Sequence, residues 1–438
     1  MFPSLKFVGL NEVRLGRRRL FYFSGCDYFR LARDPRVARA AIASLKEHGL
    51  NTAASRRTTG NLAIYTQLET ALARFFDAES ATLLPDGYFA PIAVAQALRG
   101  EVTHAFIDEF THAALQDAAL LLQCPVKPFK HRDPADLARR LAKLNSHHRP
   151  IVLTDGLFGL DGAVAPLRDY LKVLAPFCSL GQSPRKTVKA LSLASGLENS
   201  RNELAPGIHE STTCKRAGAA TVSPSPGGEG RGEGELYSNF GIRGEGVQSS
   251  NHSPLLLVDD AHGAGILGKT GQGSLEHEGV SRRHIIQCAT LSKAFGTYGG
   301  VVLSSKAFQK KILAQSRAFA GTTPLPPPLA GAAMEALKIL QHEPARLERL
   351  AQNTAYLRRQ LRAAGWPITD TPGPIVRLPG MTDLQTRKLK SKLLAAGIYP
   401  PFINYGPASG PSLFRFVVSS EHTRTQLDQV IEVLKKFK

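Results

Sequence analysis

Two short stretches carry the side chains best suited to chemistry. The first, LLLVDDAHGAG, is an apolar run from Leu255 that ends in two carboxylates, a histidine and glycines. The second, ATLSKAFGTYGG, places Thr290 shortly before Lys293. A carboxylate can keep a pyridine nitrogen protonated, and a lysine amine can bind an aldehyde cofactor as a Schiff base. The two stretches therefore predict Lys293 as the tethering amine, Asp259 as the pyridinium partner and His262 as the contact to a ring hydroxyl.

The apolar run is typical of a buried parallel strand, which delivers side chains to a site at its carboxyl end. Taken singly, the two stretches also fit an ordinary strand end and an ordinary surface lysine. Their occurrence together, in this order, favours the cofactor site.

The pattern D-x-A-H followed by T-x-x-K resembles the α-oxoamine synthases, pyridoxal 5'-phosphate enzymes that condense an amino acid with an acyl-CoA or acyl carrier protein thioester. The resemblance implies an acyltransferase of the α/β class, with fold type I of the pyridoxal-phosphate-dependent transferases (aspartate aminotransferase-like). It implies a large domain with a mostly parallel seven-stranded sheet, a smaller C-terminal α+β domain, and a homodimer with shared active sites.

Two further segments resemble motifs of this family. The turn PDGYFA is similar to S-G-[FY]-x-A-N, which implies that the amides of Tyr88 and Phe89, after Gly87, bind the cofactor phosphate at the start of a helix. The segment IDEFTHAALQDA matches D-x-x-x-H-A-S and implies that His112 stacks on the pyridine ring. A helix-capping histidine is the alternative for His112.

Matches continue toward the C-terminus. The segment FAGTTPLPPP resembles F-x-[FY]-[ST]-T-S-L-P-P, which implies that Thr322 and Thr323 reach a phosphate across the dimer interface; a proline-rich linker is the alternative. The segment FRFVVSSEHT resembles L-R-[ILF]-x-x-[ST]-x-x-H-T and implies that Arg415 holds the amino-acid carboxylate.

Several positions depart from the family pattern. Cys26 stands in place of an asparagine near the substrate carboxylate, and Ala53 and Ala54 replace glycines of G-x-G-G-[ST]-R-x-x-x-G, which predicts a stiffer loop. In DGLFGLDG, Gly159 replaces a serine and Asp155 a glutamate. The departures leave the amino acid and the acyl donor open.

Composition bounds the remaining classes. The 438 residues carry a net charge of +19, spread along the chain without a nucleic-acid-reading motif. Attraction of anionic substrates such as CoA is the simpler explanation, and a generally basic surface is the alternative. Five scattered cysteines without a CxxC pair predict neither a zinc site nor a disulfide framework. The chain has no apolar run of about 18 residues and no signal-peptide pattern, which predicts no membrane span and a cytoplasmic location.

The expected organisation is an N-terminal arm at 1–30, a large cofactor-binding domain at 31–310 and a small domain at 311–438. A segment at 181–253 is rich in glycine and serine and lacks apolar periodicity, so it is interpreted as a disordered insertion into the large domain.

Other functions remain open. The stretch GAGILGKT fits a phosphate-binding P-loop with Lys269 on the phosphates, although such a loop should open a helix. A fold type I aminotransferase also uses an aspartate, a lysine and an arginine. A binding or regulatory protein with a decayed site is a further alternative, as is a relative that uses glycine.

Overall fold

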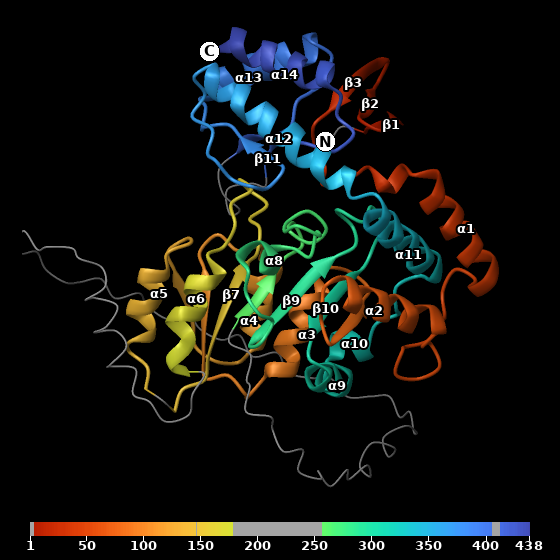
Figure 1. Ribbon diagram of the computed structural model, residues 1–438, viewed down its shortest axis with the longest axis vertical. Helices are drawn as coiled ribbons and strands as arrows, with labels where there is room; N and C mark the ends of the chain where they lie inside the picture. Colours follow the sequence, from red (N-terminus) through yellow and green to blue (C-terminus); the bar gives the residue numbers. More distant parts are fainter. Residues whose placement is uncertain (1–3, 146, 178–255, 405–411) are drawn as a thin grey trace, which may run out of the picture. The chain divides into compact units, whose positions relative to one another are not determined.

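The computed structural model describes residues 4–145, 147–177, 256–404 and 412–438. The expected insertion at 181–253 therefore lies outside the described residues. The central feature is a seven-stranded sheet with strand order β4-β10-β9-β8-β7-β5-β6 (Figure 1). Its strands are β4 (Ser80–Leu84), β5 (His104–Asp108), β6 (Val126–Phe129), β7 (Pro150–Asp155), β8 (Leu256–Asp259), β9 (Ile285–Thr290) and β10 (Gly300–Ser304).

Five neighbouring strands, from β9 to β6, run parallel, whereas β10 is antiparallel to both β4 and β9. The prediction of a mostly parallel seven-stranded sheet is confirmed. Because the carboxyl ends of parallel strands meet at one edge, β7, β8 and β9 bring their last residues together there.

Helices cover both faces of this sheet, and alternate residues of one strand enter different cores. Ile151 and Leu153 pack with α3 and α4, whereas Val152 packs with α5 and α6. The helices of this part of the chain are α1 (Pro35–His48), α2 (Ala63–Phe75), α3 (Phe89–Leu98), α4 (Ala113–Leu121), α5 (Pro134–Leu141), α6 (Leu167–Leu174), α8 (Ser274–Glu278), α9 (Lys306–Gln315), α10 (Arg317–Ala320) and α11 (Pro327–His342), with 3-10 turns η1 (Leu31–Arg33) and η2 (Ala175–Phe177).

The C-terminal elements build a separate core, which also contains Phe23 from near the N-terminus. Phe23 packs there with residues from Leu357 to Leu434. The elements are β1 (Lys6–Gly9), β2 (Glu12–Leu15), β3 (Arg18–Tyr22), α12 (Ala345–Ala363), β11 (Ile375–Arg377), α13 (Asp383–Ala395), β12 (Ile398–Tyr399), β13 (Phe402–Ile403), β14 (Leu413–Val417) and α14 (Arg424–Phe437). They form two small sheets, ordered β1-β2-β3-β12 and β11-β14-β13.

The boundary at residue 311 stays a prediction. The buried residues of α9 and α10 belong to a core of the large sheet, as do those of α11. Leu350 of α12 still belongs to the core of the large sheet, whereas Leu357 belongs to the smaller core, so the distribution of buried residues favours a change of domain within that helix.

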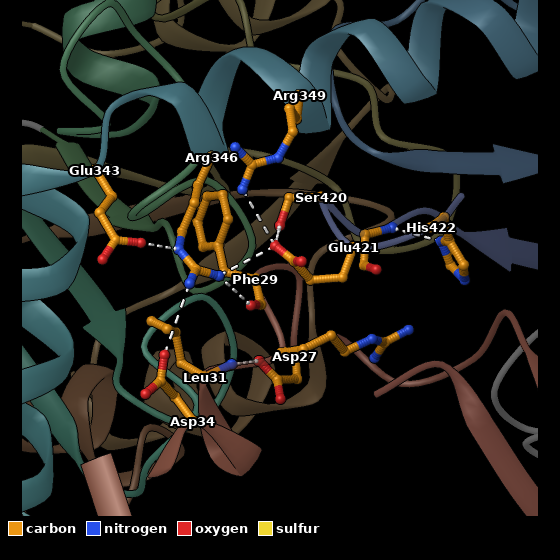
Figure 2. Close-up of polar contacts among 12 residues, drawn as sticks. Asp27, Phe29, Leu31, Asp34, Glu343, Arg346, Arg349, Ser420, Glu421 and His422 are labelled. Atoms are coloured by element: carbon orange, nitrogen blue, oxygen red, sulfur yellow. Dashed lines mark hydrogen bonds and ion pairs between the residues drawn. The ribbon is translucent and has the colours of Figure 1, made fainter. Parts of the chain in front are cut away.

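Arg346, at the start of α12, joins three segments that are distant in sequence (Figure 2). Its guanidinium lies 2.6 Å from Glu343, 3.1 Å from Glu421 and 3.6 Å from Asp34, and it also donates to the carbonyl of Phe29 at 3.3 Å. The Arg346 side chain is only 15% exposed, so water screens these ion pairs less than it would at an open surface. The network fixes the turn between Cys26 and Asp34, which leads into the candidate site.

The loop from Asn51 to Gly60 is tied down at several points. The Ser55 hydroxyl donates to the carbonyl of Ala320 at 2.6 Å, and Arg56 forms a two-pronged pair with Glu69 at 2.5 and 2.9 Å. Ala53 has φ 47°, in the left-handed region that disfavours a side chain. Alanine therefore strains the loop at a position where the family pattern has glycine.

We expect Ala53→Gly to raise the free energy of unfolding by roughly 0.5–1 kcal/mol, because removal of the left-handed strain exceeds the added entropy of the unfolded chain. Ala54→Gly is the matched control. Ala54 does not have a positive φ, so its replacement by glycine should lower the free energy of unfolding by a similar amount. Urea unfolding of both variants measures the difference. Equal effects of the two substitutions would show that Ala53 is not strained.

Candidate active site

One pocket lies at the carboxyl ends of β7, β8 and β9. Asp155 and Asp259 are register partners on adjacent strands, and the turn after β9 carries Lys293 to the same place. The pocket is lined by Asp86, Gly87, Tyr88, His112, Ala114, Asp155, Asp259, Ala261, His262, Thr290, Ser292 and Lys293. Seven residues singled out from the sequence thus meet in one place, namely Gly87, Tyr88, His112, Asp259, His262, Thr290 and Lys293.

The two carboxylates at the strand ends are buried, with Asp155 6% and Asp259 7% exposed. Burial, together with the neighbouring charge of Asp259, raises the pKa of Asp155 well above its usual range. The amide of His112 donates to Asp155 at 3.0 Å, and the amide of Ala261 donates to Asp259 at 3.0 Å. Asp155 therefore holds the start of α4, while Asp259 lines the pocket, where the sequence predicted a partner for a cationic ring nitrogen.

His112 is both a helix cap and a pocket residue. Its Nδ1 accepts from the amide of Ala114 at 3.2 Å, as the capping alternative expected, and its side chain also lines the pocket. Capping fixes the ring at the first turn of α4 without removing it from the site, so the two interpretations are compatible.

His262 is held by a residue that sequence reasoning gave no role. The Tyr28 hydroxyl lies 2.8 Å from His262 Nδ1. Burial raises the pKa of Tyr28 well above its usual range, whereas burial and the charge of Lys293 lower the pKa of His262 well below its usual range. The lowered pKa favours the neutral imidazole, and the Tyr28 hydroxyl holds its Nδ1 edge.

Gly159 is required by the position of His262. A Cβ built on Gly159 would lie 2.4 Å from His262 Nε2, so a serine cannot occupy this position while the ring stays where it is. Glycine at position 159, where the family pattern has serine, therefore leaves the space that the imidazole of His262 fills. No feature of DGLFGLDG alone indicated this, because the contact spans about a hundred residues of chain.

Four predicted residues lie outside this pocket lining. Phe89 is 37% exposed, and the Thr322 hydroxyl donates to the carbonyl of Ala318 at 2.8 Å in the turn after α10, next to Thr323. Arg415, on β14, donates to the carbonyl of Gly159 at 2.6 Å. Its charge also acts on His262, so the guanidinium lies beside the pocket.

The ring end of the pocket fits a pyridine aldehyde. It offers a buried carboxylate for the ring nitrogen, an imidazole for a ring hydroxyl and a lysine amine for the aldehyde. The opposite end fits less well, because Asp86 places a carboxylate in the turn that was expected to bind the phosphate. Its Oδ1 accepts from the Tyr88 amide at 2.7 Å. Sequence reasoning passed over Asp86, although it stands where the resembled motif has serine.

A buried acid directly follows Asp259. Asp260 is fully buried, and its Oδ2 accepts from the Ser274 amide at 2.7 Å and from Gln287 Nε2 at 2.6 Å. A Cβ on Gly263 or Gly273 would approach the Asp260 carboxylate to 2.0 Å. These glycines let the loop fold tightly over the acid, and the loop carries His262.

The stretch at residues 263–270, which fits a P-loop in sequence, lacks the structure of one. Thr270 donates its amide to Glu276 at 2.9 Å, and the amide of Gln272 donates to the same carboxylate at 3.0 Å. These donors are satisfied by the chain's own acid, and the next helix, α8, begins only at Ser274. The geometry therefore does not favour Lys269 as a nucleotide ligand.

Among the residues that the structure describes, no group of three or more histidine, cysteine, aspartate and glutamate side chains is arranged to hold a metal ion. Among the same residues, no helix combines the length and the apolar character that crossing a membrane requires.

Comparisons with known proteins agree with this geometry. The family model for aminotransferase class I and II matches residues 26–177 and 248–434. A curated relative, 8-amino-7-oxononanoate synthase of Thioalkalivibrio sulfidiphilus, is 32% identical over 96% of this chain and 88% of its own length. Among solved structures, serine palmitoyltransferase of Sphingomonas wittichii matches with a TM-score of 0.77 and 22% identity over 100% of this chain and 92% of its own. The 8-amino-7-oxononanoate synthase of Francisella tularensis matches with a TM-score of 0.67 and 21% identity over 94% and 96%.

The burial of Asp260 predicts a pH dependence of stability. Burial raises its pKa from 3.8 to about 7, so the folded chain binds a proton that the unfolded chain has released between these pH values. Stability from this group is therefore lost as the pH rises from about 4 to about 7. Buried His422, whose pKa burial lowers to about 3, acts in the opposite direction, so the comparison must be made between variants.

We expect the difference in free energy of unfolding between Asp260→Asn and the native chain to shift by roughly 2–3 kcal/mol in favour of Asp260→Asn when the pH is raised from 5 to 8. Urea unfolding of both chains at both pH values measures this shift. Glu432→Gln, on the exposed face of α14, is the control and should show no such change. A constant difference between Asp260→Asn and the native chain at both pH values would contradict the assignment.

Proposed function

Because this chain belongs to the aminotransferase class I and II family, and within it to the α-oxoamine synthases, we propose that it binds pyridoxal 5'-phosphate on Lys293 and condenses an amino acid with an acyl thioester. The observation that carries this proposal is the convergence of Asp259, His262 and Lys293 on one pocket. The family consists of enzymes, and the chain retains the charged groups that such chemistry needs.

Four residues of the pocket have roles in the proposed reaction. When bound, the cofactor supplies an electron sink for charge that develops at the α-carbon of the amino acid. Asp259 keeps the ring nitrogen protonated, and His262 contacts the ring hydroxyl. Lys293, once its amine is free, removes the proton from the α-carbon and returns it. His112 limits tilting of the ring from one face.

Arg415 is proposed to hold the carboxylate of the amino acid. A guanidinium offers paired donors to a carboxylate, and its Nε has no hydrogen-bond partner among the described residues. Cys26 Sγ lies 3.9 Å from Arg415 Nη2, and the Gly159 carbonyl accepts from Nη1. Two of the positions that depart from the family pattern, Cys26 and Gly159, therefore adjoin this arginine.

The most specific form of the proposal is 8-amino-7-oxononanoate synthase, which joins L-alanine to a pimeloyl thioester with loss of carbon dioxide in biotin biosynthesis. Its support is the relative at 32% identity over nearly the whole chain. A glycine-using relative, such as glycine C-acetyltransferase or 5-aminolevulinate synthase, is the alternative. The acyl donor is carried by CoA or an acyl carrier protein, and the basic arm at Arg14–Arg19 is a candidate contact.

A homodimer with shared active sites belongs to the same proposal. Thr322 and Thr323 lie outside the pocket lining of their own chain, as residues that serve a neighbouring copy would. Large apolar side chains are also exposed, with Leu50 at 72%, Phe110 at 57% and Leu120 at 73%, and a second copy would cover them. A cytoplasmic location stays a prediction.

An aminotransferase is the competing enzyme class. It needs a keto-acid acceptor and no thioester, whereas the proposed reaction releases a thiol without any keto acid. Thiol release from an acyl-CoA in the presence of alanine, and then of glycine, separates the two classes and ranks the amino acids.

We expect Lys293→Ala to lose the near-visible absorbance of a lysine-bound aldehyde cofactor and to slow thiol release by roughly 10²–10⁴-fold, because the same amine tethers the cofactor and moves the proton. Lys269→Ala is the matched control, since Lys269 lies in the loop after β8 but outside the pocket lining. Retention of the absorbance in Lys293→Ala would overturn the proposal, as would equal loss in both variants.

A further inference from the structure

The turn between β4 and α3 carries its own negative charge where an anion was expected to bind. The amide of Tyr88 donates to Asp86 Oδ1 at 2.7 Å, and the amide of Phe89 donates to the Asp86 carbonyl at 3.1 Å. The amide of Ala90 donates to the carbonyl of Gly87 at 3.2 Å, and Pro91 has no N–H. The amides of Tyr88, Phe89 and Ala90 at the start of α3 are therefore already engaged within the chain.

Neighbouring groups keep the Asp86 carboxylate in place. The Tyr298 hydroxyl hydrogen-bonds to Asp86, and this bond raises the pKa of Tyr298. A Cβ on Gly87 would lie 2.7 Å from Thr290 Oγ1, so the turn packs directly against the strand that leads to Lys293. The turn cannot shift sideways without losing this contact.

The hydroxyl on the other side of the turn is also engaged. Thr290 Oγ1 lies 3.1 Å from the Gly299 carbonyl and 2.9 Å from the Ser292 hydroxyl, and it accepts from the Ser292 amide at 3.2 Å. A second acid, Asp117, accepts from the Tyr88 hydroxyl. An incoming dianion would therefore meet the Asp86 carboxylate at this turn, while Asp117 holds the far end of the Tyr88 side chain.

We propose that Asp86 is an internal competitor of the cofactor's phosphate, so that it weakens binding of pyridoxal phosphate while leaving unphosphorylated pyridoxal unaffected. The inference rests on the proposed function, because it concerns how the same pocket accepts its cofactor. Binding of the phosphate requires Asp86 to release the Tyr88 amide, and the remaining carboxylate repels the dianion at short range. The ring end of the pocket then supplies most of the affinity.

Two variants separate the effect of the negative charge of Asp86 from the effect of its hydrogen bond to the Tyr88 amide. Asp86→Ser frees the Tyr88 amide and restores the residue of the resembled motif, whereas Asp86→Asn keeps an oxygen acceptor for the amide and removes only the charge. Dissociation constants of pyridoxal phosphate and pyridoxal are measured for the full-length chain through the absorbance of the lysine-bound aldehyde. Asp169→Asn, on the exposed face of α6, removes the same charge elsewhere and is the control.

We expect Asp86→Ser to tighten pyridoxal phosphate binding by about 10- to 100-fold, Asp86→Asn to tighten it by a smaller factor, and neither to change the affinity for pyridoxal. Asp169→Asn should leave both affinities unchanged. The inference is overturned if both aldehydes shift by the same factor, if neither shifts, or if the Asp86 variants bind pyridoxal phosphate more weakly.

A second measurement keeps this inference separate from the proposed function. The cofactor-free chain is titrated with inorganic phosphate while the amide signal of Tyr88 is followed by nitrogen-15 NMR. A shift of this signal in Asp86→Ser at phosphate concentrations that leave the native chain unchanged supports the inference, even if no aldehyde binds to Lys293. Equal responses of the two chains would refute it, whatever the outcome with aldehydes.

Discussion

The site depends on the register that sets Asp155 beside Asp259 at the ends of adjacent parallel strands. Two buried carboxylates at this spacing oppose each other, and the protein compensates with amide donors from His112 and Ala261 and with the nearby charge of Lys293. The pKa of Asp155 is nevertheless raised well above its usual range, which favours the neutral form of this acid. The strand register also places the Asp259 carboxylate in the pocket, where the proposed cofactor would bring its protonated ring nitrogen.

The departures from the family pattern can be understood as linked changes. Gly159 leaves the space that His262 fills, and the Tyr28 hydroxyl holds the Nδ1 edge of that imidazole at 2.8 Å. The carbonyl of Gly159 accepts from Arg415, whose other nitrogen faces Cys26. The contacts of His262 and Arg415 therefore share one short segment, and a change at Gly159 acts on both the ring contact and the carboxylate contact.

Sequence reasoning located the groups at strand ends because that relation is local. An apolar run followed by acids marks the carboxyl end of a buried strand, so Asp259 and its neighbours could be placed without coordinates. The role of Tyr28 could not be found in this way, because its partner lies 234 residues away. The left-handed backbone of Ala53 was equally hidden, since alanine gives no sign of strain in a sequence. The insertion and the domain boundaries remain predictions from composition.

Asp86 illustrates a different limit, because the turn was recognised from the sequence whereas the carboxylate that occupies its amide was not. A glycine turn before a helix suggests free amides, but an aspartate in that turn can satisfy those amides itself. The net charge of +19 does not offset this, because charges on the surface are screened over about 8–10 Å whereas Asp86 lies in the pocket. The acid at the ring end attracts a cation that the reaction needs, and the acid at the other end opposes an anion. On the proposed function, the balance between these two carboxylates, more than the overall charge, would govern how tightly this chain holds a phosphorylated pyridine.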